Sequence, residues 1–127
     1  MNTKAKGSKA ERELLHMFYN AGFGVVRAAG SGSTGLPCPD LIIGNNLRKL
    51  AIEVKNPGKE YQHLEKQQIE DLGKFSKMFG AEPWIAVKFK DWHFLTLEDI
   101  NKTKENFSIT QDIAERKGLK FEELIDF

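Results

Sequence analysis

Three charged side chains, spaced across two short apolar runs, could together hold a metal ion and activate water. Asp40 begins the run Asp-Leu-Ile-Ile-Gly, and Glu53 and Lys55 lie in Ala-Ile-Glu-Val-Lys. Alternate side chains of a β-strand share a face, so Glu53 and Lys55 point the same way, and a hairpin through residues 44–46 would bring Asp40 beside them. Two carboxylates suit Mg²⁺, and a nearby ammonium can orient or deprotonate water. A strand pair joined by a cross-strand salt bridge is the alternative, and these residues alone leave both open.

Two upstream side chains could join such a site. Ser8 and Glu11 have the spacing of a capping box at the start of a helix that runs to Asn20. Capping explains Glu11 without any chemistry, yet its place over the apolar stripe of the helix also directs it toward the sheet. Arg27 lies inside an expected strand at 23–29, where an unpaired guanidinium is costly, so we expect it to pair with a carboxylate or an anion.

A loop rich in glycine and serine precedes Asp40. Residues 30–35 match G-x-G-x-x-G, but residues 36–39, Leu-Pro-Cys-Pro, cannot open the helix that a dinucleotide site requires. The loop could embrace a phosphate or simply turn the chain. Cys38 lacks an activating histidine nearby, so we expect it to be a small packed residue rather than a nucleophile.

A second helix is predicted from about Leu64 to Phe79, ended by Gly80. Phe75 and Phe79 are four residues apart, so they share a face that either packs on the sheet or forms an aromatic pair at a subunit interface. Gln68, near the start of the helix, either reaches the catalytic face or is solvated.

Downstream, residues 83–89 form an almost continuous apolar run that predicts a central strand, and residues 93–96 predict another. A short turn is expected at 97–101. Short helices are possible at 110–116 and 122–125.

Length and composition indicate one soluble domain spanning residues 1–127, with residues 1–7 as a flexible basic arm and 102–127 as an acidic C-terminal extension. Hydrophobic residues make up 40% and charged residues 29%. A single cysteine excludes an internal disulfide, and the three histidines lack zinc-ligand spacing. Because no apolar run could span a bilayer or serve as a signal peptide, we expect a cytoplasmic location.

Charge is distributed unevenly along the chain. The formal net charge is +1, but residues 1–90 carry +5 and residues 91–127 carry −4. A basic body permits binding to nucleic acid without proving it, and a mixed solvated surface explains the charge equally well. Individual candidates for contact with a DNA backbone are Lys4, Lys6, Lys9, Arg48 and Lys49.

The ordered blocks of this sequence resemble archaeal Holliday junction resolvases of the PD-(D/E)xK nuclease superfamily. Twelve residues separate the Pro-Asp pair at 39–40 from the Glu-Val-Lys at 53–55. This short signature alone is weak, but its flanks match as well. The matching blocks are residues 6–14, 22–31, 39–42, 52–55, 75–76 and 86–88, with a weaker continuation at 118–124.

The resemblance implies an α/β fold, a restriction-endonuclease-like central mixed β-sheet flanked by α-helices. It implies that Asp40 and Glu53 bind Mg²⁺ with help from the Val54 carbonyl, with Mn²⁺ as a substitute. Lys55 would position the attacking water and stabilise charge on the phosphate, and Glu11 would complete the acidic cluster directly or through metal-bound water. No small-molecule cofactor and no membrane is implied.

The resemblance also implies a homodimer that binds branched DNA, with two active sites that cut opposing strands. Phe75 and Phe79 would lie at the dimer interface. The residues expected to contact DNA are Arg12, Arg27, Ser31, Ser33, Lys6, Lys9 and Gln68. Two alternatives remain: a restriction-like or repair nuclease acting on duplex or flapped DNA, and a non-catalytic DNA-binding module.

Overall fold

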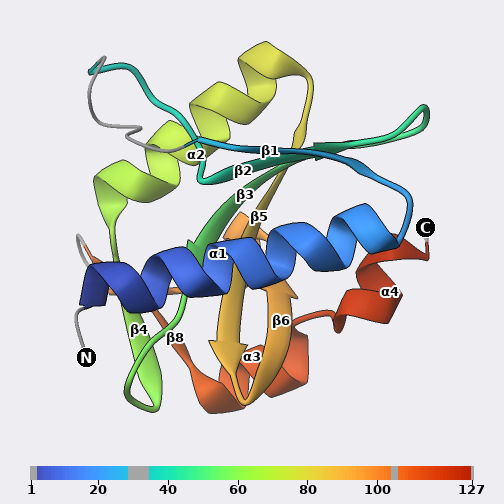
Figure 1. Cartoon of the computed structure of the whole chain (residues 1–127). Helices are drawn as coiled ribbons and strands as arrows, with labels where there is room; N and C mark the ends of the chain where they lie inside the picture. Colours follow the sequence, from blue (N-terminus) through green and yellow to red (C-terminus); the bar gives the residue numbers. More distant parts are fainter. Residues whose placement is uncertain (1–2, 29–34, 104–105, 127) are drawn as a thin grey trace.

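The computed structural model describes residues 3–28, 35–103 and 106–126. In the described residues no helix is both long enough and apolar enough to cross a membrane. The elements, in chain order, are α1 (Thr3–Asn20), β1 (Gly24–Arg27), β2 (Leu41–Gly44), β3 (Lys49–Lys55), β4 (Tyr61–Glu65), α2 (Lys66–Phe79), β5 (Glu82–Phe89), β6 (Asp91–Leu95), the 3₁₀ helix η2 (Leu97–Asp99), β7 (Asn101–Thr103), β8 (Asn106–Thr110), α3 (Gln111–Lys117) and α4 (Phe121–Ile125) (Figure 1).

A five-stranded mixed sheet with the order β1-β2-β3-β5-β6 forms the centre of the molecule. Its neighbours pair antiparallel except β3 and β5, which run parallel. The β2–β3 hairpin forms as expected, because the Asn45 Oδ1 accepts hydrogen bonds from the amides of Leu47 and Arg48 at 2.8 Å each and so closes the turn. This hairpin puts the Pro-Asp and Glu-x-Lys segments on adjacent strands.

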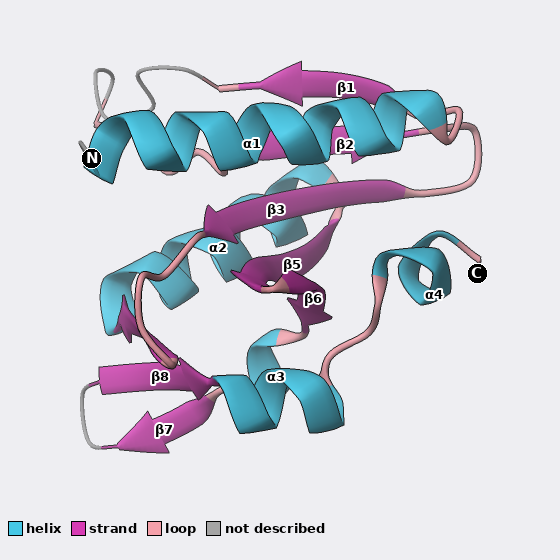
Figure 2. Ribbon diagram, turned by 60° about the horizontal axis from the view of Figure 1, so that its bottom comes forward, coloured by secondary structure: helices cyan, strands magenta, loops and turns pink. Residues whose placement is uncertain are grey.

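Alternation along β3 supplies two cores, one on each face of the sheet. Ile52 and Val54 pack with α1, whose Leu14 and Phe18 are fully buried. Ala51 packs on the other face with residues of α2, α3 and β8. Figure 2 shows α1 and α2 on opposite sides of the sheet. Glu53 and Lys55 alternate with Ile52 and Val54, so they share the α2 face.

The first helix begins earlier than the capping-box spacing predicts. It starts at Thr3, so Ser8 and Glu11 lie inside the helix and residues 3–7 are helical rather than a loose arm, which corrects both expectations. Nothing in residues 3–7 breaks a helix, since a single Gly7 costs only about 1 kcal/mol relative to alanine. The Ser8 hydroxyl accepts a hydrogen bond from Arg27 instead of capping the helix.

A second, three-stranded sheet with the order β4-β8-β7 was not predicted from the sequence. Its strand β4 pairs antiparallel with β8, from Tyr61 opposite Thr110 to Glu65 opposite Asn106. This pairing holds residues 61–65 extended, so α2 begins at Lys66 rather than at Leu64. Helix α2 ends at Gly80, as expected. Gly80 has the left-handed φ of 82°, and its amide donates a hydrogen bond to the Ser76 carbonyl.

The described part of the expected C-terminal extension is packed into the molecule. Ile109, Ile113 and Leu124 are buried, and the Phe121 ring meets the Phe18 ring edge-on with their centroids 5.0 Å apart. The acidic side chains of this segment lie on its exposed surface. Residues 106–126 therefore complete both cores, and helices α3 and α4 form close to their expected positions.

Candidate active site

Asp40 and Glu53 face each other at one end of the β2–β3 hairpin. The terminal pair of the antiparallel register joins Leu41 to Ile52, and the next residues along the chain beyond this pair are Asp40 and Glu53. The Val54 amide donates a hydrogen bond of 2.8 Å to the Asp40 Oδ2. This bond fixes the orientation of the carboxylate and leaves its other oxygen to bind a ligand.

Both acids of this pair have raised pKa values. Burial, and then the charge of Asp40, raise the pKa of Glu53 to about 7 against the lowering effect of Lys55. The pKa of Asp40 is also raised, first by burial and then by the charge of Glu11, against the hydrogen bond from the Val54 amide. A divalent cation would remove this conflict, because it stabilises both ionised carboxylates at once.

Lys55 lies on the same face as Glu53, and its Nζ is 3.9 Å from the Glu53 Oε2. This ion pair runs along β3, between residues two apart, and not across the two strands. The salt bridge of Lys55 therefore lies within β3 and does not join the two strands. The ammonium is largely shielded from solvent, with its side chain 19% exposed, and is held at the edge of the carboxylate pair.

Glu11 reaches the site from α1 and is bound by Arg27. The Arg27 Nε lies 2.9 Å from the Glu11 Oε1, and its Nη2 donates to the Ser8 Oγ at 3.0 Å. This confirms that Arg27 pairs with a carboxylate. Glu11 lies close enough to the Asp40–Glu53 pair for its charge to raise the pKa of both acids, although no three Asp, Glu, His or Cys side chains of the described residues form a group that could hold a metal ion.

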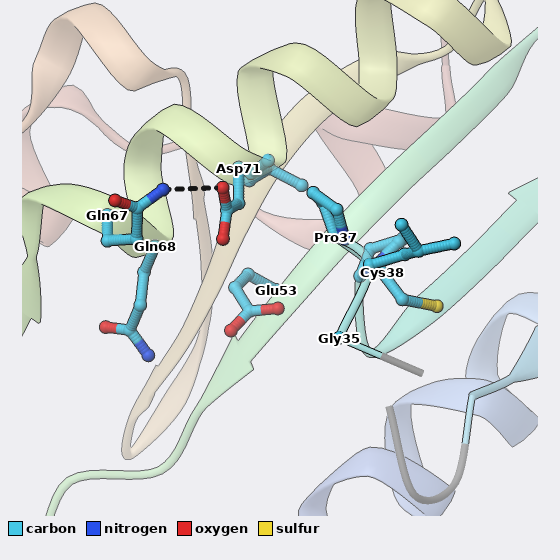
Figure 3. A pocket seen from close by; sticks show the side chains of 10 residues that line it. Gly35, Pro37, Cys38, Glu53, Gln67, Gln68 and Asp71 are labelled. Atoms are coloured by element: carbon cyan, nitrogen blue, oxygen red, sulfur yellow. Dashed lines mark hydrogen bonds between the residues drawn. The ribbon is translucent and has the colours of Figure 1, made fainter. Parts of the chain in front are cut away.

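A pocket of about 460 Å³ opens beside Glu53 on the α2 face of the sheet. Its walls come from residues 35–39 on one side and from Gln67, Gln68, Asp71 and Leu72 of α2 on the other (Figure 3). Gln68 thus faces the same pocket as Glu53. Cys38 is half-buried and lines this pocket.

Sequence reasoning missed two of these pocket residues, Gln67 and Asp71. The Gln67 Nε2 donates a hydrogen bond of 2.8 Å to the Asp71 Oδ1 (Figure 3). The available signal was a glutamine and an aspartate four residues apart on the helix that follows the Glu-x-Lys strand. That spacing is common on solvated helices, so it could not distinguish a pocket from a surface.

The expected DNA contacts fall into three groups. Lys9 and Arg12 are exposed on α1, and the Lys6 ammonium lies close to Gly58. Ser31 and Ser33 lie outside the described residues. Arg48 is occupied within the molecule, because it makes a two-pronged ion pair with Glu82 and donates to the Leu124 carbonyl. Its expected role as a backbone contact is therefore replaced by a structural one.

Phe75 and Phe79 form an apolar patch next to the pocket. Their rings stack with centroids 5.2 Å apart and planes 17° apart. Together with Met78, Leu36 and Pro37 they line a groove of about 360 Å³. Phe79 is 47% exposed and Met78 is 79% exposed, so these two side chains are left largely uncovered, whereas Phe75 packs partly against the core of the sheet. Leu36 and Pro37 line both this groove and the pocket beside Glu53.

Known proteins resemble this chain over nearly its whole length. Residues 2–127 match the family described as archaeal Holliday junction resolvase (Hjc). The crossover junction endodeoxyribonuclease Hjc of Archaeoglobus fulgidus is 39% identical over 94% of this chain and 95% of its own. That of Sulfolobus acidocaldarius is 32% identical over 100% and 91%. The solved structure of Archaeoglobus fulgidus Hjc, a Holliday junction resolvase, matches with a TM-score of 0.84 at 36% identity over 94% of each chain, which confirms the expected fold.

Proposed function

Because this chain belongs to the archaeal Holliday junction resolvase family, we propose that it is a structure-selective endodeoxyribonuclease that resolves four-way DNA junctions by paired hydrolysis of phosphodiester bonds. The observation that carries the proposal is the buried Asp40–Glu53 pair beside Lys55. We also propose that residues 1–127 form a single nuclease domain, since α3 and α4 close over the same two cores as α1 and α2.

The residues present fit a divalent metal ion, as nucleases of this kind require. The two largely buried carboxylates keep raised pKa values although Lys55 and Arg27 partly compensate their charge, and hard oxygen ligands of this number suit Mg²⁺, with the Val54 carbonyl as a further ligand. When bound, Mg²⁺ supplies Lewis-acid activation of the phosphate and lowers the pKa of water. We expect Mn²⁺ to substitute for it.

Each side chain then has a separate task. Asp40 is held in one orientation by the Val54 amide, which prearranges the acidic pair. Lys55 positions the attacking water and stabilises the charge that builds on the phosphate. Glu11 completes the acidic cluster directly or through metal-bound water, and its ion pair with Arg27 holds its carboxylate at the edge of the site.

DNA recognition follows from shape and backbone charge. Arg12, Lys9 and Lys6 lie on α1, whose residues Glu11 and Ser8 border the site, so they can follow the phosphates on either side of the cut. Arg27 contributes charge to the same edge, and we retain Ser31 and Ser33 as contacts to the scissile strand. Gln68 faces the pocket beside Glu53.

The exposed groove at Phe75, Met78 and Phe79 supports a homodimer. A second copy related by a twofold axis would cover the same patch on both chains. Four-way junctions have matching symmetry, so two copies of the Asp40–Glu53 pair could cut opposing strands. Paired incision is the property that separates a resolvase from a nuclease that nicks once.

A direct comparison of substrates tests the proposal. We expect the wild-type protein with Mg²⁺ to cut a synthetic four-way junction at paired sites and to cut its component duplexes far more slowly. Glu53→Gln should abolish cleavage and retain junction binding, whereas Glu115→Gln, on the exposed surface of α3, should leave both unchanged. Equal rates on duplex and junction would favour a restriction-like or repair nuclease. Unchanged cleavage by Glu53→Gln would refute this active site.

A further inference from the structure

The pocket beside Glu53 has two contrasting walls. Leu36, Pro37 and Leu72 give it apolar surfaces, and the amides of Gln67 and Gln68 with the carboxylate of Asp71 give it a polar one. Its volume of about 460 Å³ falls in the range of sites that enclose a small organic group, roughly 300 to 1,000 Å³. In Figure 3 Glu53 lies between these helix residues and the segment that contains Pro37.

Charge decides against two kinds of occupant. No lysine or arginine lines the pocket among the described residues, while the carboxylates of Glu53 and Asp71 do, so a phosphate would be repelled. A further metal ion is also disfavoured, because the Asp71 Oδ1 already accepts a hydrogen bond from Gln67 and Glu53 belongs to the proposed Mg²⁺ site. The remaining class is an uncharged group with flat faces and a polar edge.

The hydrogen bonds within the polar wall leave particular atoms for such a group. The Gln68 Oε1 accepts from the Glu65 amide at 3.1 Å, which directs its Nε2 elsewhere as a donor. The Gln67 Nε2 donates to the Asp71 Oδ1, so the Gln67 Oε1 and the Asp71 Oδ2 remain as acceptors. Among the described residues these three atoms have no partner. The wall therefore offers acceptors beside one donor, held in place by the helix itself.

We propose that this pocket receives one unstacked nucleobase of the junction, adjacent to the phosphate that is cut, and that Asp71, Gln67 and Gln68 read its edge. The proposal rests on the function proposed above and adds a base preference to it. Cytosine and adenine carry an amino donor next to a ring-nitrogen acceptor, which complements the acceptors of Asp71 and Gln67 and the donor of Gln68.

A branched substrate lowers the free energy needed to unstack a base and place it in the pocket. Moving a base out of the stack costs least where it is already poorly stacked or unpaired, and base pairs at the branch point meet that condition. Leu36 and Pro37 on one side and Leu72 on the other provide the apolar surfaces between which a flat base can lie. The same base in continuous duplex would have to be extracted first, so the pocket also favours branched DNA.

Cleavage of matched junctions tests the base preference. The junctions share a fixed branch point and differ only in the nucleotide flanking the cut, which is varied through all four bases on either side. We expect the wild-type protein to cut sites with cytosine or adenine at one flanking position at least about fivefold faster than those with thymine or guanine. Asp71→Asn replaces an acceptor with a donor, and Gln68→Glu keeps the acceptor for the Glu65 amide while removing the donor, so each should reduce or redirect the preference.

A fluorescence measurement tests the pocket without cleavage. The junction carries 2-aminopurine beside the cut and is bound in Ca²⁺, so that loss of stacking raises its emission. We expect a rise with the wild-type protein and a smaller rise with Asp71→Asn. The matched control is Glu115→Gln on α3, which changes the same kind of pair, since the Gln111 Nε2 donates to the Glu115 Oε1 at 3.0 Å.

The outcomes separate this inference from the proposed function. Equal rates on all four bases, or a preference that Asp71→Asn and Gln68→Glu leave unchanged, would overturn the pocket while the junction resolvase stands. Failure to cut any junction would overturn the proposed function instead. In that case the 2-aminopurine signal still decides the pocket, because no emission change on binding would overturn it.

Discussion

The Asp40 carboxylate accepts a hydrogen bond of 2.8 Å from the Val54 amide, which ties the acid before β2 to the backbone of β3. This bond makes the position of one carboxylate depend on the register of the hairpin. It also holds Asp40 beside Glu53, where burial and the charge of Asp40 raise the pKa of Glu53, and burial and the charge of Glu11 raise the pKa of Asp40. The arrangement favours a bound cation and lowers the stability of the metal-free protein.

Asp40→Asn should therefore separate catalysis from stability. The substitution keeps the shape of the side chain but removes its charge, so we expect cleavage to fall by at least about 100-fold, as for loss of a charge-stabilising group. The metal-free protein should become more stable, because Glu53 no longer faces a second buried charge. Single-turnover cleavage and urea unfolding in EDTA measure the two effects. A less stable metal-free variant would contradict the repulsion.

The pKa of Glu53 predicts how stability depends on pH without metal. Its folded value of about 7 lies above the ordinary 4.5, so the folded state binds more protons than the unfolded state between these values. The stability due to protonated Glu53 is fully present below pH 4.5 and is lost as the pH rises through 7. Between pH 5 and 8 in EDTA, we expect wild type to lose on the order of 2 kcal/mol more than Glu53→Gln. Parallel pH profiles in urea unfolding would refute this.

The hairpin could be predicted because its signals are local. Alternation in residues 49–55 and the polar turn at 45–46 act between neighbours in the chain, and the Asn45 side chain closes the turn that its residue type suggested. By contrast, β4 and β8 pair across more than 40 residues, with no short-range signal. The pairing of Arg27 with Glu11 likewise depends on packing of α1 over β1, so the sequence predicted a partner for Arg27 but not which one.

Arg27 should contribute to both stability and catalysis through Glu11. Both side chains of the pair are largely buried, so we expect Arg27→Ala to cost about 1.5 to 3 kcal/mol, the range for hydrogen bonds to charged groups. Arg27→Lys keeps the charge but cannot reach Glu11 and Ser8 together. It should recover part of the stability and less of the cleavage rate. Full recovery of both by lysine would show that charge alone matters at this position.

The groove on α2 predicts the oligomeric state. Met78 is 79% exposed in the single chain, so Met78→Glu should not disturb folding, yet it would place a charge in the twofold contact. We expect sedimentation to show a dimer for wild type and a monomer for the variant, with loss of paired cuts. Leu47→Glu is the matched control, because Leu47 is 86% exposed in the β2–β3 turn, outside the groove. A dimer that persists in Met78→Glu would move the interface elsewhere.

Substitution of Arg48 should lower stability and leave DNA binding unchanged, and substitution of Arg12 should do the reverse. Arg48 makes ion-pair and hydrogen-bond contacts within the molecule, whereas Arg12 is an exposed cation. Arg48 joins Glu82 at 2.8 Å and 2.9 Å and donates to the Leu124 carbonyl, so it links the β2–β3 turn to β5 and α4. Its pKa is raised by the hydrogen bond to Glu82, which shows how strongly the charged form is held. We expect Arg48→Ala to lower the free energy of unfolding by about 1 to 3 kcal/mol, since it removes this donor from the Leu124 carbonyl and leaves the part-exposed Glu82 carboxylate with the Trp84 Nε1 as its remaining donor. Junction affinity at fixed salt should not change.

Arg12→Ala should leave the free energy of unfolding unchanged and reduce the slope of log affinity against log salt concentration by about 1, as expected for one lost phosphate contact. Urea unfolding and salt titrations of both variants settle the assignment: a reduced salt slope for Arg48→Ala would return this residue to the DNA-binding surface.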